Sequence, residues 1–197
     1  ARIDSIGTAN ALFAETTTPA AHAATAGIDL TVPVRGGPGI GVIGPIEFST
    51  PLRQAFGDDA HVKDYLAQAA IPGTPAETPP TIAQALADAG PHHHRRVLEA
   101  VTVEARDFFR AMRKVGIADG PMYATGGWAR SHALMELRAS IFGEPITVVH
   151  EPELTALGAA LFALEAATGV KPDAMRQRAT EVIEPRRDWM DAYARWP

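Results

Sequence analysis

The sequence has 197 residues, 46% hydrophobic and 21% charged, which is ordinary for a globular protein. Its formal net charge of -5 offers no basic surface to nucleic acid or to an anionic membrane, and no apolar run reaches the roughly 18 residues of a transmembrane helix. The absence of cysteine excludes disulfides and thiol chemistry and suits a cytoplasmic protein.

Three segments near the start are expected to form a β-meander. They are residues 2–6, 28–34 and 40–48, rich in β-branched and other apolar residues. The first runs into the tight turn Gly7-Thr8, and residues 35–39 form a Gly/Pro-rich turn. Between the first two strands, residues 9–15 are expected to form a helical turn.

A long helix is the strongest periodic signal of the middle region. Short helical pieces are expected over residues 49–90, around a proline-rich loop at 71–80. After them, apolar residues recur every three or four positions along one helix face. These are Val97, Val101, Ala105, Phe108, Met112 and Val115. Gly116 ends the helix.

The last part of the chain alternates strands with helices. Strands are predicted at 121–125 and 145–149, and helices at 130–142 and 153–167. The second helix is expected to turn Leu157, Ala160, Leu161 and Leu164 inward. Strand-helix-strand-helix order implies parallel strands with right-handed crossovers. The whole order predicts an α/β, ribonuclease H-like domain: a mixed sheet, with a three-strand meander followed by β-α-β-α and helices on both faces.

Two strand-to-turn junctions have the chemistry of a phosphate site. One is Gly7-Thr8, and the other is Gly126-Gly127, followed by Arg130 and Ser131 at a helix start. Glycine lets the backbone approach a phosphate, and successive N–H groups and a helix N-terminus attract anions. An ordinary structural turn explains a Gly-Gly pair equally well.

Motifs in both halves of the sequence resemble the FGGY carbohydrate kinases. The segment Gly126-Gly127-Trp128-Ala129-Arg130-Ser131, followed by Glu153-Leu154-Thr155-Ala156-Leu157-Gly158-Ala159-Ala160, resembles that family's C-terminal signature. Residues 4–9 resemble its second phosphate-binding turn, and residues 95–100 resemble the start of its long helix. The tail, with Pro185, Tyr193 and Trp196, resembles its C-terminal end. The resemblance implies an actin-like ATPase fold.

The resemblance also implies roles for individual residues. Gly7 and Thr8 would face the transferable phosphates of ATP. Gly126 and Gly127 would let the backbone pass the α-phosphate or ribose, and Arg130 and Ser131 would lie near the adenosine. Gly158 and Ala159 would keep the last helix slim where it packs behind the nucleotide loop. Ala9 departs from the family pattern, since many members have a second hydroxyl residue there, so the phosphate grip is expected to be lighter or to be completed by groups outside this chain.

The chain is expected to be a fragment, residues 1–197 forming the C-terminal nucleotide-binding domain of a two-domain sugar kinase. It opens without Met and inside an apparent strand. In the family, Mg²⁺ spans the phosphates and the aspartate that deprotonates the sugar hydroxyl lies upstream. No catalytic residue is therefore assigned here, with Asp4 as a lesser candidate for a catalytic or metal-binding carboxylate. The sugar or polyol would bind to the missing N-terminal domain, and the isolated chain is expected to be inactive and is a possible homodimer.

Two further segments resemble known ligand-binding motifs but do not match them. The glycines from Gly36 to Gly41 fail the dinucleotide fingerprint, because Val42 stands where a glycine is required. His150-Glu151 is no zinc motif, because Leu154 replaces the second histidine, and no metal site is predicted. One alternative to a kinase half stays open, a non-catalytic actin-like nucleotide sensor or partner-binding module. A Rossmann-like oxidoreductase domain is disfavoured by the failed glycine fingerprint and by the leading meander.

Overall fold

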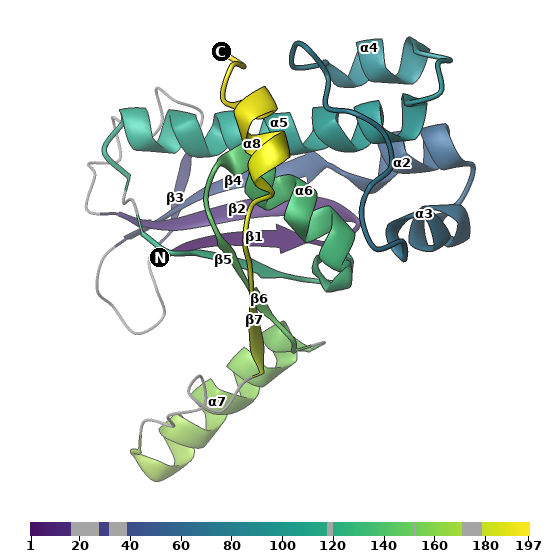
Figure 1. The fold of residues 1–197 in the computed structure, drawn as a ribbon. Coiled ribbons are helices and arrows are strands. Elements are labelled where there is room, and N and C mark those ends of the chain that lie inside the picture. The colour runs from purple at the N-terminus through teal and green to yellow at the C-terminus, as the bar shows by residue number, and fades with distance from the viewer. Residues whose placement is uncertain (17–27, 32–38, 118–119, 152, 171–178) are drawn as a thin grey trace.

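A seven-stranded mixed sheet runs through the centre of the protein (Figure 1). The computed structural model describes residues 1–16, 28–31, 39–117, 120–151, 153–170 and 179–197, and gives the backbone alone for 42–45. The strand order across the sheet is β3-β4-β2-β1-β5-β6-β7. The strands are β1 (Arg2–Ile6), β2 (Ala9–Thr16), β3 (Asp29–Thr31), β4 (Gly39–Glu47), β5 (Met122–Thr125), β6 (Ile146–Val149) and β7 (Thr180–Ile183).

The leading part of the sheet is antiparallel, as predicted, but its second member differs. β1 pairs with β2, β2 with β4, and β3 lies at the edge beside β4. The helical turn expected over residues 9–15 is wrong. Asn10, Leu12, Ala14 and Thr16 are buried at every second position, a strand period that small and polar residues conceal in the sequence. Of the turn predicted over 35–39, Gly39 is the first residue of β4, whereas residues 35–38 and the predicted strand end at 32–34 lie outside the described residues.

The second half of the sheet confirms the predicted parallel crossovers. β5 pairs parallel with β1 on one side and with β6 on the other. Helix α6 (His132–Phe142) connects these two strands. β7, which the sequence did not reveal, pairs antiparallel with β6 at the far edge. The carboxyl ends of β1 and β5 therefore open at the same edge of the sheet.

The helices that bury side chains gather on one face of the sheet, with α5 as the longest (Figure 1). They are α2 (Ser49–Phe56), α3 (Asp59–Leu66), α4 (Ile82–Ala87), α5 (His93–Lys114), α6, and α8 (Arg187–Tyr193). In α5 the predicted stripe is buried at Val97, Val101, Ala105 and Met112. These side chains and the inward side chains of the strands and of α6 form one hydrophobic core.

The C-terminal segment closes this layer through a buried ionic cluster on α5. Arg95 Nε donates to Glu99 Oε1 at 2.9 Å, and Arg95 Nη2 donates to the Tyr193 hydroxyl at 2.7 Å. The Tyr193 hydroxyl donates in turn to Glu99 Oε1 at 2.7 Å. Burial, followed by the charge of Glu99, raises the pKa of Tyr193, so the hydroxyl keeps its proton and the cluster stays closed.

Helix α7 (Leu154–Thr168) stands away from this body (Figure 1). None of its residues is buried, and Leu164 is 50% exposed. The prediction that Leu157, Leu161 and Leu164 belong to the core is therefore wrong. The packing role predicted for Gly158 is also wrong, because a Cβ built there meets no atom within 4 Å. Within the described residues, no helix is both long and apolar enough to cross a membrane.

Candidate functional site

The two glycine-containing junctions of the sequence meet at the edge where β1 and β5 end. Ser5 lies opposite Thr125 in the parallel pair, so the turn after β1 and the loop after β5 are neighbours. Gly126 has φ +101°, and a Cβ on it would lie 2.4 Å from the Ile6 carbonyl oxygen. Only glycine allows this backbone conformation and this close approach. The loop therefore lies directly against the end of β1.

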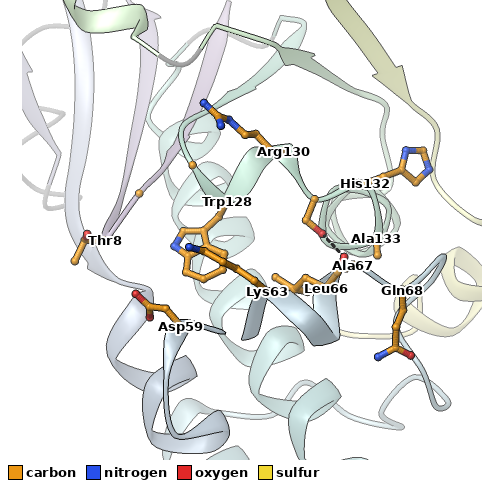
Figure 2. Close-up of a pocket in the computed structure, with 13 residues that line it drawn as sticks. Thr8, Asp59, Lys63, Leu66, Ala67, Gln68, Trp128, Arg130, His132 and Ala133 are labelled. Carbon is orange, nitrogen blue, oxygen red and sulfur yellow. Dashed lines mark hydrogen bonds between the residues drawn. The ribbon is translucent and has the colours of Figure 1, made fainter. Parts of the chain in front are cut away.

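A cavity of about 750 Å³ opens beside this contact (Figure 2). Its volume is in the range of small-molecule sites. Three parts of the chain form its wall: the β1–β2 turn, helix α3 with the residues that follow it, and the segment from Gly127 into α6. The lining residues are Gly7, Thr8, Asp59, Lys63, Leu66, Ala67, Gln68, Gly127, Trp128, Arg130, Ser131, His132 and Ala133.

The structure brings five of the six predicted site residues to this cavity. Gly7, Thr8, Gly127, Arg130 and Ser131 line it, whereas Gly126 packs against β1 behind it. A Cβ built on Gly127 meets no protein atom within 4 Å, so this stretch of backbone faces open space. The Arg130 side chain is exposed and lies apart from Lys63 and Trp128 (Figure 2).

Ser131 has a structural task at the start of α6. Its hydroxyl accepts a hydrogen bond from the Leu134 N–H at 3.2 Å, which is an N-cap. The same hydroxyl donates to the Leu66 carbonyl at the end of α3, at 3.0 Å. Its single proton is therefore already engaged. Only acceptor capacity is left for a ligand.

Helix α3 contributes a side of the cavity that sequence reasoning missed. The Lys63 side chain lines it and makes no hydrogen bond or ion pair with the described residues, so its ammonium is available to an anion. Asp59 also lines it, but its carboxylate is held by Arg53, with Nε 2.8 Å from Oδ1. Asp58 caps the helix by accepting from the His61 N–H, which lowers the Asp58 pKa. No motif marks Lys63, because only the tertiary fold brings α3 opposite a loop more than 60 positions away.

Trp128 forms part of the cavity wall at the first position of a short 3-10 turn, Trp128–Arg130. It is half-buried, and its ring centroid lies 6.2 Å from that of the buried Phe48. One part of the indole is thus supported by the core while the rest reaches the cavity. An aromatic surface of this kind suits a flat, apolar ligand group.

Asp4 is not a catalytic or metal-binding group. Its side chain is fully buried, and its Oδ2 accepts hydrogen bonds from Arg138 Nε at 2.9 Å and Nη2 at 2.5 Å. A carboxylate closed off in this way reaches neither solvent nor the cavity. In the part of the chain that the structure describes, no three His, Asp or Glu side chains gather as a metal site.

Known proteins similar to this chain are sugar and polyol kinases. A glycerol kinase from Myxococcus xanthus is 34% identical over 99 residues, which are 48% of this chain and 20% of that protein. A xylulose kinase structure from Brucella ovis aligns with 98% of this chain and 45% of its own, at a TM-score of 0.75 and 22% identity. A structure of Plasmodium falciparum glycerol kinase with ADP aligns with 98% of this chain and 46% of its own, at a TM-score of 0.61 and 17% identity.

The solved structures and the family model support different conclusions. The solved structures establish the fold, which is that of the FGGY kinases, an actin-like ATPase fold. The chain spans about a fifth of the curated relative and less than half of the solved kinases. The family model for the C-terminal domain of the FGGY carbohydrate kinases matches residues 47–167, more than half of the chain. This chain therefore belongs to the FGGY family of carbohydrate kinases.

Proposed function

We propose that the cavity binds ATP and ADP, and that residues 1–197 are the nucleotide-binding half of a carbohydrate kinase. The whole protein transfers the γ-phosphate of ATP to a hydroxyl of a sugar or polyol held by an N-terminal domain. The observation that carries the proposal is the meeting of Gly7-Thr8 and the loop from Gly126 to Ser131 on one cavity. We place this reaction in the cytoplasm, which a cysteine-free chain suits.

The geometry supports a division of the cavity between phosphates and nucleoside. Gly7 and Thr8 offer a backbone turn and an exposed hydroxyl to the transferable phosphates. The open space at Gly127 admits the α-phosphate or ribose, with Gly126 holding the loop in place. Arg130, Ser131 and Trp128, which also line the cavity, are assigned in this proposal to the adenosine. The Gly7 N–H already donates to the Ala9 carbonyl at 3.0 Å, so this turn offers the exposed Thr8 hydroxyl as the donor to a phosphate oxygen.

Lys63 supplies positive charge in this division. It lies on α3, on the wall that faces the junctions, and has no partner among the described residues. An ammonium beside polyphosphate forms charge-assisted hydrogen bonds, which are stronger than neutral ones. We infer that Lys63 adds to the phosphate grip in a chain where Ala9 lacks the hydroxyl common in the family.

The described part of this chain supplies few groups that could bind Mg²⁺ and no catalytic base. Asp59 is the one described carboxylate that lines the cavity, and it is paired with Arg53. We therefore propose that Mg²⁺ is held mainly by the nucleotide phosphates, by water and by groups of the N-terminal half. That half also supplies the aspartate that takes the proton of the sugar hydroxyl. In isolation the chain binds nucleotide without turnover.

Calorimetric titration of the chain with Mg-ADP and Mg-ATP tests the proposal. We expect a dissociation constant on the order of micromolar to millimolar. Gly127→Val places a side chain into the open space that the protein leaves at this position, so it should fold normally and abolish binding. Thr8→Val should weaken binding through the lost hydroxyl.

Gly158→Val is the matched control, because Gly158 also has open space around it but lies on α7, away from the cavity. It should bind like the wild type. Absence of nucleotide binding to the folded wild-type chain, or equal binding by Gly127→Val, would contradict the assignment of this cavity.

A kinase assay of the protein together with its N-terminal half separates the proposal from a non-catalytic nucleotide sensor. Phosphorylation of one member of a panel of pentoses, deoxyhexoses and polyols is expected. Nucleotide binding without any transfer across the panel would favour the sensor. Family membership makes the sensor the less favoured of the two.

A further inference from the structure

Three buried side chains form a closed cluster under the candidate nucleotide site. Asp4 of β1 accepts from Arg138 of α6 through Oδ2, and from Asn10 Nδ2 through Oδ1 at 2.6 Å. Arg138 Nη2 also donates to Asn10 Oδ1 at 3.2 Å, which closes the ring. All three side chains have 0% exposure. Two strands and a helix are thus joined by one set of directional bonds.

The cluster contributes less to the free energy of folding than apolar residues in the same place would. Transfer of a carboxylate and a guanidinium from water is unfavourable, and an apolar replacement of a buried pair is often neutral or stabilising. Here Arg138 Nη1 has no partner in the described structure, so part of the desolvation is uncompensated. The Phe142 ring, 5.3 Å from the guanidinium carbon, offsets some of this cost. Stability alone therefore gives little reason for these three residue types.

The position of each member is informative. Asp4 and Asn10 flank the Gly7-Thr8 turn, and Asn10 pairs with Ile6, the last residue before it. Asn10 Nδ2 also donates to the Ser5 carbonyl at 3.1 Å. Arg138 lies seven residues, or about two turns, after Ser131 on the same face of α6. The helix that begins at the adenosine-side loop is thus bonded directly to the base of the phosphate-side turn.

We propose that Asp4, Asn10 and Arg138 are positioning residues that fix the Gly7-Thr8 turn relative to the loop from Gly126 to Ser131, so that both grip one nucleotide at the same time. This inference rests on the proposed function. Each junction alone makes weak contacts with a part of the ligand. A fixed spacing between them makes the second contact intramolecular, which raises affinity without any new contact.

Two isosteric variants test this, each removing one charge from a fully buried arginine–carboxylate pair. Asp4→Asn alters the cluster at the site, and Glu99→Gln alters the Arg95–Glu99–Tyr193 cluster, which does not line the cavity. Both variants should lose stability. After correction for the folded fraction, Asp4→Asn should bind Mg-ADP at least about tenfold more weakly, because the competent spacing is less populated. Glu99→Gln should bind within about twofold of wild type.

The ratio of ADP affinity to adenosine affinity distinguishes a positioning role from a purely structural one. It occupies one junction only, so its affinity, measured by NMR titration, should be unchanged in Asp4→Asn while that of ADP falls. A cluster that served stability alone would lower both affinities by the same factor, or neither. Equal ratios of ADP to adenosine affinity in Asp4→Asn and Glu99→Gln would overturn the proposal.

The triple variant Asp4→Val/Asn10→Leu/Arg138→Met covers the case in which Asp4→Asn does not fold. It replaces all three polar side chains by apolar groups, so no polar side chain of the cluster is left without a partner and the melting temperature should be preserved while the directional bonds are lost. Weak ADP binding by this stable variant supports the proposal, and normal ADP binding overturns it. Failure of the wild-type chain to bind Mg-ADP would instead overturn the proposed function, and this inference with it.

Discussion

The burial of helices α6 and α7 is the reverse of what their amino-acid composition suggests. In α6, eight of eleven residues are buried, although the helix contains His132, Glu136 and Arg138. In α7, which is almost entirely apolar, no residue is buried. Both helices end at a glycine in the left-handed conformation, Gly143 with φ 74° and Gly169 with φ 68°. Local capping at the C-terminus therefore does not explain the difference.

The difference comes from what each helix packs against. α6 connects β5 and β6, two parallel strands that each have a neighbouring strand on both sides, lies beside α5 and α8, and is capped by Ser131. α7 leads from β6 to an edge strand, and its N-cap residue, Glu153, makes no side-chain cap bond. Apolar residues stabilise a fold only where another surface removes them from water. The comparison predicts that the same substitution has very different effects in the two helices.

Hydrogen exchange should show the largest contrast. The backbone amides in the middle of α6 are expected to exchange only on global unfolding, whereas those of α7 open locally. We expect α7 to exchange faster by a factor of about 100 or more, equivalent to about 3 kcal/mol of local opening free energy. Peptide-resolved mass spectrometry measures this. Equal protection of the two helices would mean that α7 packs on a surface in solution.

A leucine-to-alanine pair sharpens the comparison in free energy. Leu137→Ala in α6 removes a fully buried side chain, so the free energy of unfolding should fall by about 2–5 kcal/mol. Leu161→Ala in α7 removes a side chain that is only partly buried, and the loss should stay below about 1 kcal/mol. Urea titration followed by circular dichroism gives both values. A similar loss in both variants would break the comparison.

The N-caps predict a smaller difference. Ser131→Ala removes the cap of α6 and the bond to Leu66, and should cost about 1–2 kcal/mol of unfolding free energy. Glu153→Ala at the corresponding position of α7 removes no cap bond and should change stability by about 0.5 kcal/mol or less. Thermal melts of the two variants provide the measurement. A larger loss for Glu153→Ala would show that its carboxylate has a partner at the helix start.

Glu181 should have the smallest effect. This β7 side chain contacts His132 Nδ1 at the start of α6 at 3.1 Å, and His150 Nε2, shortly before α7, at 3.2 Å. All three side chains are substantially exposed, so Glu181→Gln should change the free energy of unfolding by no more than about 0.5 kcal/mol. Urea titrations at low and high salt test this. A loss above about 1 kcal/mol would show that these contacts fasten the region before α7 to α6.

The sequence predicts the segments with a clear period or motif and fails where neither exists. The stripe on α5 and the parallel strands β5 and β6 follow from apolar periodicity and order. β2 was missed because its buried positions include the polar residues Asn10 and Thr16. Asn10 is bound by Asp4 and Arg138, a contact that no local pattern reveals. At the site, the glycine junctions marked two of the three parts of the cavity wall, the β1–β2 turn and the segment that starts at Gly127. The wall formed by Lys63 and the rest of α3 had no local signal.

The sequence by itself determined part of the local chemistry of this protein: the apolar stripe of α5, the order of β5, α6 and β6, and the glycine that the loop after β5 needs at position 126. These properties depend on neighbouring residues and on backbone sterics, which can be derived from the order of amino acids. Only the tertiary structure decided that Asp4 is bound by Arg138 rather than free, that Lys63 and Gly127 line the same cavity, and that the leucines of α7 are not buried. Each of these depends on burial and on contacts between residues far apart in the chain, so no local pattern contains it.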